Sequence, residues 1–119
     1  MQVPVFLLRK LYVKGSLKNT DLGFEFKIKN SLSNGTAIGI DPIKVDGVEY
    51  PLDSLKISAE GTEVEASKIA PNNAFPIKVG VEITLHVKAP SLSPGQHKLD
   101  ISLTTKEVGK LAFDVTDTI

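Results

Sequence analysis

The sequence predicts an all-β fold: a sandwich of two antiparallel sheets, immunoglobulin-like or jelly-roll-like, with about seven to nine short strands. Apolar and polar residues alternate with a period of two in several segments, and turn-forming residues recur about every eight to twelve residues. No window shows a sustained helical apolar period, and Pro or Gly interrupts every stretch long enough for a substantial helix. A partly closed barrel is the alternative architecture.

The N-terminal segment contains an apolar run, Val5, Phe6, Leu7 and Leu8, which the basic Arg9 follows. Because the positive charge comes after the run, the order is wrong for a secretory signal, and we interpret the run as the first strand. A strand that is apolar in consecutive positions must be covered on both faces. Either it lies centrally in the sandwich or another chain covers it, and the second possibility predicts self-association or docking onto a larger subunit.

Three later segments alternate strictly between apolar and polar residues, as half-buried strands do. Their apolar sets are Phe24, Phe26 and Ile28; Val81, Ile83, Leu85 and Val87; and Leu99, Ile101 and Leu103. His97 continues the apolar set of the third segment, whereas His86 belongs to the polar set of the second. The two histidines therefore face opposite ways, and we expect no metal site that both share.

The connections between the expected strands contain tight-turn residues. These turn signals are Asp46-Gly47, Glu60-Gly61, Ser93-Pro94-Gly95 and Val108-Gly109. The first two separate short β-prone runs, and Asp-Gly in this setting is the strongest short-range signal for a hairpin. Single turns of helix fit only near residues 51–55 and 66–69.

The segment from Ala70 to Pro76 is expected to be the longest loop, and loops are where binding surfaces concentrate. We place Tyr12, Tyr50 and Phe75 outside the core. Exposed aromatic side chains near a loop favour a small-ligand or carbohydrate site, so this segment and the two tyrosines form the alternative binding surface.

Composition excludes several classes of function. The chain has 14 basic and 14 acidic residues with Arg9 as its only arginine, which disfavours a nucleic-acid partner. No stretch approaches the roughly 20 apolar residues of a membrane span. Cysteine is absent, which excludes disulfides and thiolate metal sites and suits the cytoplasm. Phosphate-binding loops and nucleophile elbows are also missing, so we expect no catalytic, cofactor-binding or metal-binding residues.

These observations predict a single domain over residues 1–119 that has a structural or accessory role and acts through protein–protein association. It would be a homo-oligomer or the small subunit of a larger enzyme. The first alternative is the small-ligand or carbohydrate module described above. The second is an enzyme built around His86 or His97 with a nearby carboxylate.

Three pieces of the chain, in order, read Gly23-Phe24-Glu25-Phe26, Val45-Asp46-Gly47-Val48-Glu49-Tyr50-Pro51 and Leu92-Ser93-Pro94-Gly95-Gln96-His97-Lys98-Leu99. Their order and spacing resemble those of the small β subunits of C-glycoside deglycosylation enzymes. The resemblance implies a non-catalytic sandwich that binds a larger, metal-dependent barrel subunit, which carries most of the catalytic residues. Over residues 29–35 the chain lacks that family's tyrosine- and arginine-bearing stretch, so no functional residue is transferred.

The chain also resembles small archaeal chains that carry a hydroxymethylglutaryl-CoA reductase label. That enzyme is a far larger chain with nicotinamide and CoA sites and a catalytic His, Lys and acids. The resemblance therefore implies no reductase activity in this chain, and it leaves the expectation of an accessory domain unchanged.

Overall fold

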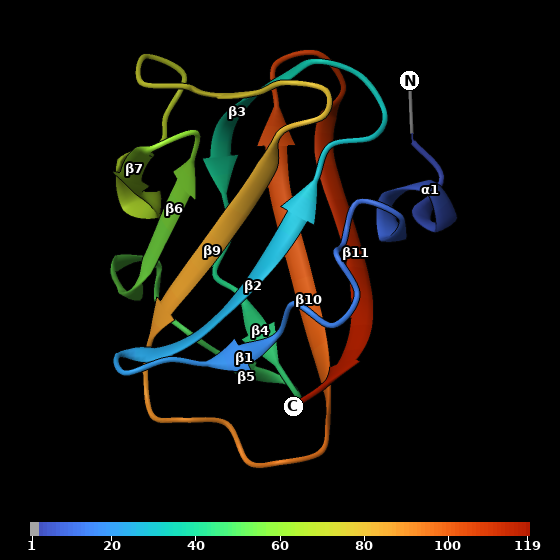
Figure 1. The fold of residues 1–119 in the computed structure, drawn as a ribbon. Coiled ribbons are helices and arrows are strands. Elements are labelled where there is room, and N and C mark those ends of the chain that lie inside the picture. Colours follow the sequence, from blue (N-terminus) through green and yellow to red (C-terminus); the bar gives the residue numbers. More distant parts are fainter. Residues whose placement is uncertain (1–2) are drawn as a thin grey trace.

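A computed structural model describes residues 3–119 and shows two packed β-sheets (Figure 1). The first sheet has the spatial order β1 (Lys18–Asn19), β2 (Gly23–Lys29), β9 (Glu82–Lys88), β6 (Leu55–Ala59) and β7 (Thr62–Glu65). The second has the order β5 (Val48–Glu49), β4 (Lys44–Val45), β10 (Gln96–Thr105), β3 (Gly35–Ile40) and β8 (Phe75–Ile77), and β11 (Gly109–Thr118) also pairs with β10. All these pairings are antiparallel. The predicted antiparallel two-sheet sandwich is confirmed.

The described part of the chain contains eleven strands, more than the seven to nine expected. Three of them, β1, β4 and β5, have only two residues each, too short for an alternating pattern to reveal. Three short helical elements complete the fold: the α-helix α1 (Val5–Arg9) and the 3-10 turns η1 (Leu52–Ser54) and η2 (Ala66–Lys68). The two 3-10 turns lie where single helical turns were expected. Met1 and Gln2, the start of the predicted domain, lie outside the described residues.

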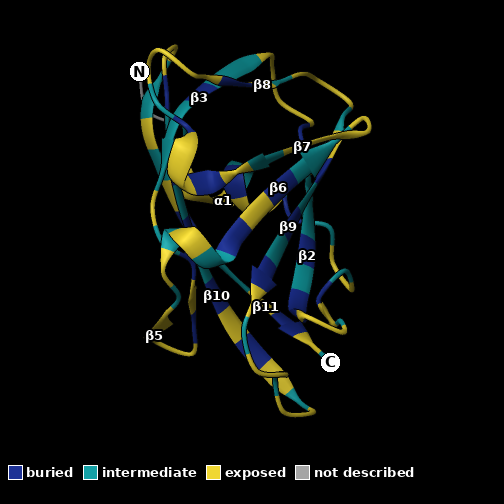
Figure 2. Ribbon diagram, turned by 90° about the vertical axis from the view of Figure 1, so that its left-hand side faces the viewer, coloured by how far each residue is buried: buried dark blue, intermediate teal, exposed yellow. Residues whose placement is uncertain are grey.

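The core lies between the sheets and is built from the predicted apolar sets. Figure 2 shows buried residues alternating with exposed or intermediate ones along β6 and β10. Phe24, Phe26, Leu99 and Ile101 are at most 1% exposed. Ile28, which belongs to the same set as the two phenylalanines, is only half-buried because it borders the cavity described below.

Two predicted hairpins are confirmed by their backbone geometry. Asp46 and Gly47, between β4 and β5, have φ angles of 53° and 82°. Glu60 and Gly61, between β6 and β7, have φ angles of 49° and 80°. Positive φ at both central residues matches the right-handed twist of the flanking strands, which is why such turns are favoured in two-residue hairpins.

The prediction of a first strand at Val5–Leu8 is wrong, because these residues begin α1. Leu8 is 2% exposed and Phe6 is 62% exposed, so the run divides into an inward and an outward face, as a helix requires. A short continuous apolar run fits a strand or a helix equally well, and periodicity alone does not separate the two. Within residues 3–119, no helix combines the length and the apolar character needed to cross a membrane.

Two of the three aromatic residues expected outside the core are buried. Tyr12 is 8% exposed, and Phe75 is 7% exposed and begins β8 rather than lying in a loop. Pro76 is tolerated in this strand because β8 lies at the edge of its sheet, where no second neighbour requires its missing N–H. Tyr50 is half-buried and packs edge-on against Phe24, with ring centroids 5.3 Å apart. The predicted aromatic binding surface is therefore not formed.

Candidate functional site

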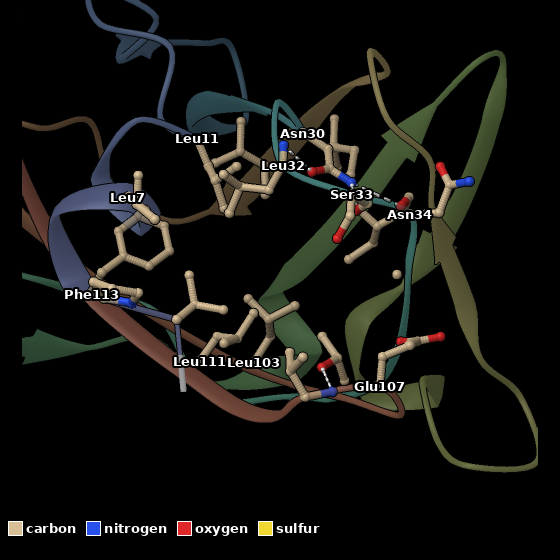
Figure 3. Close-up of a pocket in the computed structure, with 18 residues that line it drawn as sticks. Leu7, Leu11, Asn30, Leu32, Ser33, Asn34, Leu103, Glu107, Leu111 and Phe113 are labelled. Atoms are coloured by element: carbon tan, nitrogen blue, oxygen red, sulfur yellow. Dashed lines mark hydrogen bonds between the residues drawn. The ribbon is translucent and has the colours of Figure 1, made fainter. Parts of the chain in front are cut away.

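A cavity of about 300 Å³ opens between the two sheets, beside α1. It lies at the end of the sandwich where β2 and β10 end and β11 begins. Figure 3 shows apolar side chains surrounding the hollow, with Leu11 and Leu32 on one side and Leu103 and Leu111 facing them. Leu7 and Phe113 close a third side, so the walls of the cavity are mostly hydrocarbon.

The faces of the N-terminal segment explain where the cavity forms. Leu8 is buried in the core, whereas Leu7 and Leu11, four residues apart, lie on one side and line the cavity. Phe6 is exposed to solvent. Arg9 anchors the helix to β11: its Nε donates to the Asp114 backbone oxygen at 2.9 Å, and its guanidinium donates to the Asp114 carboxylate at 2.8 Å.

The cavity continues toward the core. A second void of about 30 Å³ lies deeper between the sheets and shares four lining residues with the larger cavity: Ile28, Ile77, Ile83 and Leu103. Protein interiors usually contain few voids larger than one water molecule. The cavity of about 300 Å³ is therefore much larger than an ordinary packing defect.

Asn30 is the main buried polar residue in the cavity wall, at 7% exposure. Its side-chain amide donates to the backbone oxygens of Ser33, at 2.7 Å, and Ile77, at 3.0 Å. Its oxygen accepts the backbone N–H of Leu32 at 3.1 Å. Asn30 thus holds the loop that forms one side of the cavity, and these bonds already engage both its nitrogen and its oxygen.

The opposite wall contains Thr105, which is 6% exposed. Its hydroxyl donates to the backbone oxygen of Gly109 and accepts the backbone N–H of Val108, both at 3.1 Å, within the turn from β10 to β11. Among the described residues, no buried side-chain nitrogen or oxygen lacks a hydrogen-bond partner. The buried polar groups of the cavity wall therefore serve the fold.

A carboxylate lies at the rim of the cavity. Glu107 is exposed and accepts hydrogen bonds from the hydroxyl of Thr36, at 2.9 Å, and from the backbone N–H of Thr36, at 2.8 Å. These bonds lower the pKa of Glu107, with the hydroxyl as the largest cause and the charge of Lys106 as a smaller one, so the Glu107 carboxylate is ionised at neutral pH.

Exposed apolar side chains gather near the cavity. Val5 and Phe6 belong to α1, Leu32 lines the cavity, and Val79 donates its backbone N–H to the lining residue Asn34 at 2.8 Å. These four are among the six large hydrophobic residues that are exposed in the described structure. The other two, Leu22 and Val48, belong to the turn before β2 and to β5, which lie at the far end of the molecule in Figure 1.

His97 is buried, as its place in an apolar set predicted, and it does not line the cavity. Its Nδ1 lies 2.6 Å from the Asp46 carboxylate and its Nε2 lies 2.7 Å from the Ser93 backbone oxygen. The Ser93 oxygen and the Asp46 carboxylate both accept hydrogen bonds, so this geometry favours the ring that carries a proton on each nitrogen. The Ser93 oxygen and the Asp46 carboxylate raise the pKa of His97. The arrangement ties the β4–β5 hairpin to the loop before β10.

His86 lies in the polar set of β9, as predicted, and also does not line the cavity. Its Nε2 is 3.0 Å from the Ser58 hydroxyl and its Nδ1 is 3.6 Å from the Glu25 carboxylate. Each histidine therefore has a carboxylate nearby, the arrangement that the enzyme alternative requires. In residues 3–119, no group of three or more potential ligands could hold a metal ion.

A buried carboxylate that sequence reasoning missed fastens the N-terminal segment to the last strand. Asp117 is 6% exposed and accepts hydrogen bonds from the Tyr12 hydroxyl at 2.6 Å and from the backbone N–H groups of Gly15 and Leu17 at 2.9 and 3.2 Å. Burial and the adjacent carboxylate raise the pKa of Tyr12. Burial also acts to raise the pKa of Asp117, but the hydrogen bonds from Tyr12 and the backbone outweigh it, so this pKa is lowered.

The fold and the cavity define the class of this protein: an antiparallel β-sandwich domain with an apolar cavity at one end. Residues 7–119 match the family described as hydroxymethylglutaryl-CoA reductase, N-terminal domain, and the chain therefore belongs to this family. No curated protein matches the chain.

The family match decides between the two resemblances noted in the sequence. It agrees with the hydroxymethylglutaryl-CoA reductase label and gives no support to the resemblance to C-glycoside deglycosylation subunits. The family is described as the N-terminal domain of an enzyme, so the chain is a domain associated with an enzyme. This agrees with the expectation that the chain is at most an accessory part of one.

Proposed function

We propose that this chain is a non-catalytic accessory domain that binds another protein through the outer face of α1. The partner is a larger enzyme subunit, and a second copy of this chain is the alternative. The observation that carries the proposal is the exposure of Phe6, at 62%, and of Val5, at 45%, on one short helix. The missing cysteine supports a reducing compartment, and we place the domain in the cytoplasm.

The chemistry of this face suits a protein partner. Aromatic side chains dominate the binding energy of many interfaces, and a polar rim usually surrounds them. Phe6 would be such an anchor, and the Arg9–Asp114 ion pair would belong to the rim. The family description supports an enzyme partner, because an N-terminal domain of an enzyme has a catalytic part to act with.

The histidines favour no competing enzyme function. Both ring nitrogens of His97 lie against hydrogen-bond acceptors of the chain itself, Asp46 and Ser93, so neither is directed at a substrate. His86 is half-exposed on the outer face of the first sheet, away from the residues that line the cavity.

The test compares the wild-type chain with Phe6→Ser in two measurements. Light scattering gives the native mass, and a pull-down from the cells that make the protein shows whether a stoichiometric larger subunit is retained. We expect the wild type to oligomerise or to retain the subunit, and Phe6→Ser to weaken that association at least tenfold. Val48→Ser is the matched control, because Val48 is 57% exposed and lies in β5 at the far end.

Two results contradict the proposal. One is a monomeric wild-type chain that retains no partner. The other is an association that Phe6→Ser leaves unchanged, or that Val48→Ser weakens equally, because either would place the interface elsewhere.

A further inference from the structure

We propose that the cavity beside α1 binds a small, uncharged molecule with an aliphatic chain. This inference goes beyond the proposed function, which uses the solvent-exposed side chains of the same helix, Val5 and Phe6. It rests on the size of the cavity, on the chemistry of its walls and on the charge at its rim.

The size of the cavity fits a small molecule. Its volume of about 300 Å³ is at the lower limit of the usual range for small-molecule sites, roughly 300–1,000 Å³. The deeper void of about 30 Å³ continues it between Ile28, Ile83 and Leu103. A cavity of this size, with only a small void beside it on the core side, suits a slender chain better than a bulky ring system.

The walls select for an apolar ligand. Leu7, Leu11 and Leu111 are only half-buried, because no other side chain of residues 3–119 fills the space between them, and a ligand would complete their burial. The buried polar residues of the wall, Asn30 and Thr105, already spend their side-chain atoms on the backbone. A ligand group with strong hydrogen-bonding needs would lose its water without replacement, which is costly.

The rim distinguishes a neutral ligand from an anionic one. The Glu107 carboxylate lies at the rim, and its hydrogen bonds to Thr36 hold it in place. A ligand carboxylate beside it would be repelled, whereas a hydroxyl would have an acceptor available. An aliphatic alcohol is therefore a better probe of this site than a fatty acid of equal length.

The test titrates the full chain with 1-hexanol, 1-heptanol and 1-octanol, and with octanoate as the charged match of 1-octanol. Calorimetry gives the affinities, and methyl NMR signals of Leu103 and Leu111 report the location. We expect saturable binding that tightens about fourfold per added methylene group, the fold-change that follows from burying one such group. Octanoate should bind at least tenfold more weakly than 1-octanol.

Filling the cavity tests the location independently. Leu7→Phe adds volume inside the cavity and should weaken 1-octanol binding at least tenfold. Val48→Phe introduces the same side chain at the far end of the molecule and should leave 1-octanol binding unchanged. Should Leu7→Phe fail to fold, Leu32→Phe fills the cavity from an exposed loop position. Phe6→Ser should weaken protein association while leaving alcohol binding intact, so the two proposals fail separately.

Three results would overturn the binding of an aliphatic molecule in the cavity. The first is the absence of saturable binding by every alcohol. The second is binding that the folded cavity-filling variants leave as tight as in the wild type. The third is NMR shifts confined to residues outside the cavity, which would mean that the alcohols bind elsewhere. Octanoate that binds as tightly as 1-octanol would overturn the choice of a neutral ligand.

Discussion

The same two strands build opposite ends of this molecule in different ways. At one end, called the closed end here, β10 and β11 place His97 and Asp117 as directly paired residues. At the other, the open end, the same strands pair Leu103 with Leu111, and both line the cavity. The closed end is held by hydrogen bonds between buried polar side chains and nearby loops, whereas the open end is apolar and incompletely filled.

This difference shows how a small sandwich divides stability from function. At the closed end, His97 holds the β4–β5 hairpin and Asp117 holds the segment after α1, so loops far apart in sequence are fixed to the sheet. At the open end, leucine side chains from the described part of the chain line a space that its other side chains leave unfilled. Regions with few buried apolar contacts contribute least to stability and are the ones free to bind ligands.

The largest expected effect compares one leucine beside the cavity with one leucine in the filled core. Leu99 is 0% exposed, and Leu99→Ala should lower the free energy of unfolding by about 3–5 kcal/mol, because it removes buried methyl groups and leaves a new void. Leu111 is half-buried beside an existing hollow, so Leu111→Ala should cost only about 1–2 kcal/mol. Urea unfolding followed by circular dichroism measures both, and equal losses would mean that the cavity is filled in solution.

The second prediction concerns the buried carboxylate of the closed end. Asp117→Ala leaves the Tyr12 hydroxyl and the backbone N–H groups of Gly15 and Leu17 without an acceptor, and we expect a loss of about 2–4 kcal/mol. Asp21→Ala, at an exposed turn, is the matched control and should change stability little. A loss no greater than that of the control would show that solvent readily replaces the carboxylate.

Local chemistry allowed much of this fold to be predicted. The alternation of Phe24 and Phe26 with charged residues identifies an inward face, and Asp46-Gly47 identifies a hairpin, because both signals depend only on neighbours in sequence. The burial of Phe75 could not be found in this way. It depends on the pairing of β8 with β3, whose residues are nearly forty positions away in the chain.

Most of the candidate site, the cavity above all, could not be predicted from the sequence. Leu103 belongs to an inward set whether or not the space it faces is filled, so the pattern carries no information about the cavity. The apolar run at Val5–Leu8 did predict a binding role for this segment, and Leu7 of this run lines the cavity, although the run forms a helix rather than a strand. Asp117 had a readable signal: it continues the inward phase of Phe113 and Val115, and a carboxylate in such a phase requires buried partners.

The smallest expected effect is a pH dependence at the closed end. The hydrogen bonds of His97 to Ser93 and Asp46 raise its pKa in the folded protein above the ordinary value of about 6.5. The folded state therefore binds the proton more tightly than the unfolded state. The resulting stability is fully present below pH of about 6.5 and is lost as pH rises through the folded pKa of His97. Asp117, its neighbour on β11, stays ionised throughout this range because its pKa is lowered.

His97→Gln tests this prediction, because glutamine keeps a hydrogen-bonding side chain but does not titrate. We expect a loss of about 1–2 kcal/mol at pH 6 that shrinks as pH rises above the folded pKa of the wild-type histidine. His86→Gln is the control, since His86 is half-exposed and lies outside this network. Urea unfolding from pH 5 to pH 9 measures the dependence. A wild-type stability that stays constant across this range would show that the closed end does not depend on the protonated His97. A stability that falls equally in the wild type and in His97→Gln would show that another group causes the pH dependence.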